Sequence, residues 1–155
     1  MARPGLDWSG SILCLDPGET TGWALFEGIA LADCGQWPTP EPQLLAENIQ
    51  HLAEIYTLER IVYESYRIRG NKIREHIGSE VVTIQHIGAI KVVADERGIP
   101  TTAQTAGMAK GFATDTKLRR WGLYQSNHRH ANDSIRHGVY WLLFYAGRKD
   151  PRIVR

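Results

Sequence analysis

Three acidic residues of this chain each lie at the end of an apolar segment. Asp16 closes the segment 11–16, and Glu64 closes the segment 61–64. Asp133 opens the last strongly apolar helix. A carboxylate that is partly withdrawn from water is costly unless another group compensates its charge. Three of them directed at one point repel each other, so a shared cation is the simplest compensation. Oxygen ligands of this kind favour Mg²⁺ or Mn²⁺. The three acids therefore predict metal-assisted chemistry, with phosphate as the expected reacting group.

The hydrophobic pattern predicts an α/β fold of one domain over residues 1–155, in the order β-β-β-α-β-α-β-α. We expect strands at 11–16, 23–26, 29–34, 59–64 and 101–104, helices at 41–57, 81–97 and 131–146, and partly helical structure at 106–124. The turns between the first three strands are too short for parallel crossovers, so these strands form an antiparallel meander. The prediction is a five-stranded mixed sheet with helices on both faces.

The net charge of +1 conceals an asymmetry between the two parts of the chain. Residues 1–66 hold 10 of the 17 acidic residues and only two basic ones, whereas residues 67–155 hold 16 basic and seven acidic residues. Such a difference arises by chance in many solvated surfaces. Here the basic residues gather in predicted loops, which indicates contact with a polyanion. The residues concerned are Arg67, Arg69, Lys72, Arg74, Lys110, Lys117, Arg119 and Arg120.

Each candidate site residue also has an ordinary structural interpretation. Asp16 precedes Pro17-Gly18, so it also fits a turn aspartate. Glu64 also fits a solvated loop residue, and Asp133 an acid favoured by the helix dipole. His130 lies three residues before Asp133, and both side chains face one way if the helix begins there. That pairing makes His130 a candidate metal ligand or proton-handling group.

Three motifs in order resemble the RuvC-type Holliday junction resolvases, and most of all their bacteriophage-encoded relatives. The motifs are Leu15-Asp16-Pro17-Gly18-Glu19-Thr20-Thr21-Gly22-Trp23-Ala24, Val62-Tyr63-Glu64 and His130-Ala131-Asn132-Asp133-Ser134. The resemblance spans nearly the whole chain and implies the ribonuclease H-like fold. It also implies a homodimer that cuts two opposing strands of a four-way DNA junction, in the cytoplasm of a bacterial cell or of a phage-infected host.

The resemblance further implies that Asp16, Glu64, His130 and Asp133 form the catalytic metal site, with Mg²⁺ or Mn²⁺ and two ions per subunit. Many members carry an aspartate where this chain has His130. The segment 66–72 would probe the junction centre, where Tyr66 or Ile68 would wedge against bases; alternatively, Tyr66 packs the loop onto the sheet. Lys110 and Lys117 would correspond to the lysines that follow the fifth strand in the family.

Other functions share parts of this pattern. The segment 16–22 also resembles the first phosphate loop of actin-like sugar kinases, but those proteins need a second such domain. A non-catalytic junction-binding protein of the same fold is a further alternative, although it would gain nothing from carboxylates beside phosphates. A ribonuclease H-like enzyme acting on RNA or RNA–DNA hybrids also remains open, because the same site cuts either backbone.

The remaining sequence features indicate an intracellular protein. Cys14 and Cys34 both lie in predicted strands and fit buried, reduced thiols, and the sequence holds no zinc-like cysteine spacing. The N-terminus lacks the apolar stretch of a signal peptide. No apolar run approaches the roughly 20 residues of a membrane span, so we expect no membrane partner. The long helix at 75–98 is the expected dimer face.

Overall fold

The computed structural model describes residues 8–66 and 77–146. Its strands are β1 Ser11–Asp16, β2 Thr20–Glu27, β3 Ala30–Pro38, β4 Leu58–Glu64 and β5 Thr101–Gln104. Its helices are α1 Pro42–Ile55, α2 Ile77–Glu96, α3 Ala106–Phe112, α4 Asp115–Arg120 and α5 Arg129–Phe144.

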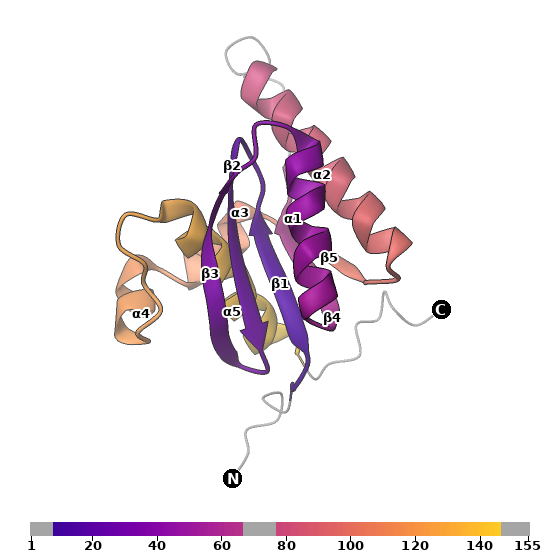
Figure 1. Cartoon of the computed structure of the whole chain (residues 1–155). Coiled ribbons are helices and arrows are strands. Elements are labelled where there is room, and N and C mark those ends of the chain that lie inside the picture. Colours follow the sequence, from indigo (N-terminus) through magenta and orange to yellow (C-terminus); the bar gives the residue numbers. More distant parts are fainter. Residues whose placement is uncertain (1–7, 67–76, 147–155) are drawn as a thin grey trace.

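The five strands form one mixed sheet in the order β3-β2-β1-β4-β5. The strands β1, β2 and β3 pair antiparallel as a meander, whereas β4 and β5 run parallel to β1. This arrangement confirms the predicted sheet and explains why helices lead into β4 and β5 (Figure 1). The carboxyl ends of β1 and β4 therefore lie next to each other, since Leu15 pairs with Tyr63 one residue before each strand ends.

Helices cover both faces of the sheet, as the sequence predicts. The helices α1 and α2 pack side by side on one face, and α5 crosses the other face together with α3 (Figure 1). Successive residues of β1 enter opposite cores: Ile12 and Cys14 face α5, whereas Leu13 and Leu15 face α1 and α2. All four side chains are buried. A strand covered on both sides has no polar alternation, which accounts for the continuous apolar run that ends at Asp16.

Two glycines allow α5 to approach the sheet closely. A Cβ atom on Gly22 would lie 1.9 Å from the backbone oxygen of His130, and one on Gly138 would lie 2.3 Å from the ring of Phe26. Gly22 pairs with Asp16 across the first hairpin. The close approach at Gly22 therefore brings the first turn of α5 directly against the end of β1.

Several element boundaries differ from the sequence prediction. The first turn is shorter than expected, because residues from Thr20 onward already pair with β3. The last helix begins at Arg129, two residues earlier than predicted, so His130 lies inside its first turn. The partly helical stretch 106–124 forms two short helices that are separated at Ala113 and Thr114. Cys14 is buried and Cys34 is partly buried, and neither forms a disulfide. Within the described ranges, no helix has the length and apolar character needed to span a bilayer.

We expect Gly22→Ala to lower the free energy of unfolding by roughly 1–3 kcal/mol, the usual cost of overpacking. The added methyl group would collide with the backbone of His130, which has no side-chain torsion to relieve the contact. Urea unfolding measures the change. Gly88→Ala is the matched control, because a Cβ atom there meets nothing within 4 Å and alanine favours the helix α2. A Gly22→Ala protein as stable as the wild type would contradict the close packing.

Candidate active site

The ends of β1 and β4 lie side by side at one edge of the sheet, and the start of α5 packs against the end of β1. These elements carry the four site residues predicted from sequence. Asp16 is the last residue of β1 and Glu64 is the last residue of β4. His130 and Asp133 lie in the first turns of α5. The three carboxylates are largely buried, with side-chain exposures of 12% for Asp16, 19% for Glu64 and 18% for Asp133. At this edge each carboxylate has its own positively charged or hydrogen-bonding neighbour.

Asp16 is bonded to His130. The Nδ1 atom of His130 lies 2.9 Å from Oδ2 of Asp16, and its Nε2 atom lies 3.5 Å from Nε of Arg129. Because the arginine only donates, Nε2 is the accepting nitrogen and Nδ1–H donates to Asp16. The backbone N–H of His130 donates to Oε1 of Gln36 at 3.0 Å, which fixes the start of α5 against β3. The imidazole therefore orients the carboxylate of Asp16.

Glu64 is bonded to a second histidine on α5. The Nε2 atom of His137 lies 3.0 Å from Oε2 of Glu64, and its Nδ1 atom lies 2.9 Å from Oε1 of Gln104. The side-chain nitrogen of Gln104 is buried and makes no hydrogen bond. The oxygen and nitrogen of an amide have nearly the same shape. Turning the amide over lets this nitrogen donate to Nδ1 of His137 while Nε2–H donates to Glu64.

Asp133 lies between two basic side chains. The Nζ atom of Lys110 is 3.2 Å from its Oδ2 atom and 3.8 Å from Oε2 of Glu64. The other oxygen, Oδ1, accepts from Arg136 at 3.0 Å. Arg136 also donates to the carbonyl oxygen of Ala113 at 2.8 Å and to Asp115. Lys110 thus bridges Glu64 and Asp133, and Arg136 ties Asp133 to the turn between α3 and α4.

The charges at this edge act on one another. Burial by itself raises the pKa of Glu64, but the hydrogen bond from His137 and the charge of Lys110 outweigh it, so this pKa lies below its usual value. Burial also raises the pKa of Asp133, and Lys110 offsets this only in part. Repulsion from Asp16 and Glu64 adds to the effect of burial, so the pKa of Asp133 stays above its usual value. The pKa of Lys110 is raised, because its attraction to the acids outweighs its burial.

The donor set fits a hard divalent cation. Among the residues that the structure describes, no three acidic, histidine or cysteine side chains already form a group that could hold a metal ion. Yet three carboxylates lie near enough for Asp16 and Glu64 to perturb Asp133, and a single ammonium stands between two of them. Carboxylate oxygens are the ligands that Mg²⁺ and Mn²⁺ prefer, and their excess negative charge is what a divalent ion would neutralise.

Similarity to known proteins is found in structure and not in sequence. No protein-family model and no curated protein matches the chain. The RuvC of T. thermophilus in complex with a Holliday junction substrate matches with a TM-score of 0.71 at 15% identity, covering 88% of this chain and 97% of that one. A second T. thermophilus RuvC structure matches with a TM-score of 0.64 at 17% identity, over 88% and 97% of the two chains. The yeast mitochondrial Holliday junction resolvase Ydc2 matches with a TM-score of 0.58 at 13% identity, over 86% and 78%.

The chain has the RuvC fold. This fold is the ribonuclease H-like arrangement that the resemblance of the three motifs implies. The edge of the sheet where Asp16 and Glu64 meet α5 is the carboxyl edge of its parallel strands, the usual position of ligands in open α/β sheets.

The residues predicted to contact DNA lie in several different environments. The sequence predicts Lys110 only as a DNA contact, but its ammonium lies against Glu64 and Asp133 in the acid cluster. Lys117 donates to the backbone carbonyl oxygen of Phe112 at 2.8 Å, and its ammonium lies over the aromatic ring of the same residue. Arg119 stacks on Tyr124, 3.7 Å from the ring centroid, and Arg120 is exposed. Tyr66 lines a cavity of about 390 Å³ beside β5. The remaining four, Arg67, Arg69, Lys72 and Arg74, lie outside the described residues.

Sequence reasoning missed three residues of the site: Gln104, Arg136 and His137. A signal for His137 exists, because positions 130, 133 and 137 fall on one face of a helix. The apolar residues around His137 obscure this signal, because a histidine in such a stretch is easily taken for an ordinary core residue. Arg136 gives no such signal, since its partners Asp115 and Ala113 come from a turn that is distant in sequence.

We expect Lys110→Met to raise the pKa of Asp133 further above its usual value in the metal-free protein. The ammonium is the main group that lowers this pKa, and burial and the other acids remain. Carboxyl ¹³C chemical shifts followed over pH measure the titration. Lys117→Met removes the same charge from a side chain that binds a backbone carbonyl and serves as the control. An unchanged titration of Asp133 in Lys110→Met would show that Lys110 does not compensate it.

Proposed function

We propose that this chain is a metal-dependent, structure-selective DNA endonuclease that resolves four-way junctions by phosphodiester hydrolysis, acting as one nuclease domain over residues 1–155. The observation that carries the proposal is the convergence of Asp16, Glu64 and Asp133 at the carboxyl edge of a RuvC-type sheet. The gathering of three carboxylates at one edge of the sheet is expected for a cation site. It serves no purpose in a protein that only binds phosphate.

The four residues Asp16, Glu64, His130 and Asp133 would hold Mg²⁺ or Mn²⁺, with two ions in each subunit. When bound, such ions would lower the pKa of water and neutralise the negative charge that develops on the phosphate as water attacks it and the sugar oxygen leaves. The hydrogen bond from His130 orients Asp16, and His137 orients Glu64. Among the described residues, Lys110 is the one ammonium in contact with two of the acids, and it would stabilise negative charge that develops on the phosphate.

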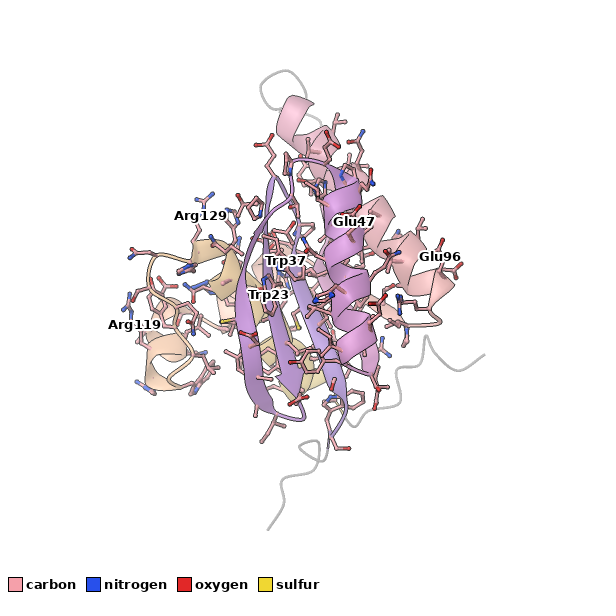
Figure 2. All side chains as sticks on the ribbon, in the orientation of Figure 1. Trp23, Trp37, Glu47, Glu96, Arg119 and Arg129 are labelled. Carbon is pink, nitrogen blue, oxygen red and sulfur yellow. The ribbon has the colours of Figure 1, made fainter. Side chains whose placement is uncertain are left out.

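The distribution of charge supports a polyanionic substrate on one side of the molecule. Arg119 and Arg129 project from the side of α4 and α5, whereas Glu47 and Glu96 lie on α1 and α2 (Figure 2). Arginine and lysine contact phosphates without reading sequence. We infer that DNA approaches across α4 and the start of α5. The basic segment that contains Arg67, Arg69, Lys72 and Arg74, together with Tyr66, is proposed to contact the junction centre.

We expect purified protein to cut a labelled four-way junction in the presence of Mg²⁺ or Mn²⁺ and not in the presence of a chelator. Asp16→Asn should abolish cutting, because it removes negative charge at the centre of the site, and should leave junction binding unchanged or tighter. Single-turnover cleavage and gel-shift binding measure the two properties. Asp33→Asn is the matched control, since Asp33 is exposed on β3, away from the site, and its bond to the Cys34 N–H survives as an amide oxygen.

The same assay separates the alternatives. A panel of four-way junction, flap, duplex and RNA–DNA hybrid identifies the preferred substrate, and preference for the hybrid would replace the proposal with a ribonuclease activity. Binding without cutting by the wild-type protein would indicate a junction-binding protein. Loss of binding together with cutting in Asp16→Asn would assign a structural role to Asp16.

The proposed reaction calls for a homodimer, because two symmetric cuts need two sites related by a two-fold axis and each chain carries one set of acids. The exposed apolar side chains Val81, Ile84 and Val92 on α2 support this helix as the contact face. Sedimentation equilibrium should give twice the chain mass of 17.5 kDa at assay concentrations. Val81→Lys combined with Ile84→Lys should shift the protein toward the monomer, and a wild-type monomer would refute the assembly.

A further inference from the structure

A polar cavity of about 480 Å³ opens beside His130, on the side away from Glu64 and Lys110. Its lining comes from the starts of β2 and α5, the end of β3 and the loop that precedes α5. His130 is shared between this cavity and the acid cluster, because it lines the cavity and its ring bonds Asp16. A strand held at Asp16 therefore has this cavity as its immediate neighbour.

The chemistry of the lining suits a nucleotide. Tyr124 offers an aromatic ring, Arg129 an exposed guanidinium, and Gln36 and Asn127 offer amide groups. Of the described residues that line the cavity, none is acidic. The guanidinium of Arg119 lies on the ring of Tyr124 and adds a second positive charge beside it. Aromatic and arginine surfaces stack on nucleic acid bases, and arginine binds phosphate. The volume lies in the range of about 300–1,000 Å³ that is usual for small-ligand sites.

The loop that forms one wall is held in place by side chains of the same region. The buried amide of Asn132 accepts from the backbone N–H of Gln125 and donates to its carbonyl oxygen, both at 2.8 Å. The ring of His128 bonds the carbonyl oxygen of Ser126 at 2.8 Å. These contacts hold the wall of the cavity within the protein itself, so a bound group would find its partners already oriented.

We propose that this cavity receives the nucleotide next to the phosphate that is cut, with its base on Tyr124 and a backbone phosphate on Arg129. The proposal deepens the proposed nuclease function and rests on it for the identity of the strand. It assigns to the cavity a role in placing the scissile phosphate over Asp16, and it makes the base at this position a determinant of cutting rate.

A binding experiment tests the cavity without relying on cutting. A 5′-phosphorylated tetrathymidylate is titrated into the ¹⁵N-labelled Asp16→Asn protein, and backbone amide shifts are followed. We expect the largest shifts over residues 123–130. Tyr124→Leu, which keeps apolar contact with the core, and Arg129→Gln should each weaken the affinity by about tenfold, an effect of the size known for base stacking. Arg97→Gln, on a side chain paired with Glu54, removes the same charge and should leave the affinity unchanged.

Shifts that lie elsewhere, together with affinities insensitive to Tyr124→Leu and Arg129→Gln, would overturn the proposal. Binding at residues 123–130 by a protein that cuts no branched DNA would instead refute the nuclease function and leave a nucleotide site. The two failures are therefore distinguishable.

A cleavage experiment tests the role of the base. Each of the two nucleotides that flank the cut is replaced in turn by an abasic residue, and single-turnover rates are compared with those of the intact junction. At one of the two positions, the wild-type protein should cut the intact junction about tenfold faster than the abasic junction. This ratio of rates should fall close to one in Tyr124→Leu and return to about ten in Tyr124→Phe. Equal ratios for the wild type and Tyr124→Leu at both positions would overturn the assignment of the base to Tyr124.

Discussion

The electrostatic cost of three largely buried carboxylates determines how this edge of the molecule is built. Each acid has a main partner: His130 for Asp16, His137 for Glu64, and Lys110 with Arg136 for Asp133, and Lys110 also reaches Glu64. Three of these four partners lie on α5. The helix can supply them only if it lies close to the sheet, which is why Gly22 and Gly138 stand where any side chain would collide with the helix or the strand opposite. Charge compensation at the site and close helix–sheet packing are thus the same requirement.

This requirement also explains which parts of the molecule the sequence predicts. The central strand is recognisable because both of its faces are covered, and the acid that ends it is recognisable because it interrupts an apolar run. Asp16, Glu64 and Asp133 are each visible from local sequence for this reason. The sheet order follows from turn lengths and crossover rules. The start of β2 at Thr20 is set by pairing with β3, so the residues around Thr20 do not by themselves reveal this boundary.

The partners of the acids are harder to predict because they are defined in three dimensions. Lys110 follows β5 in a segment that reads as one more basic loop, and only the packing of α3 against α5 brings its ammonium to Asp133. His137 is fully buried within an apolar helix, and Gln104 ends a short strand. A histidine and a glutamine in such positions usually serve only to form hydrogen bonds with other buried polar groups of the core. Their relation to Glu64 depends on the register between β4 and β5, where Glu64 pairs with Gln104.

The compensating groups differ in how freely they can move. Arg136 and His137 are buried and have further partners, so displacing either would leave buried polar groups unpaired. Lys110 is 44% exposed on a flexible stem and contacts the acids only through Nζ. Its ammonium is strongly hydrated in water, so withdrawing it from the cluster is the least costly of the possible rearrangements. The proposed metal site would have to be stable without an ion and still accept one. Such a site needs one movable cation among fixed ones, and Lys110 is the side chain whose position would satisfy both conditions.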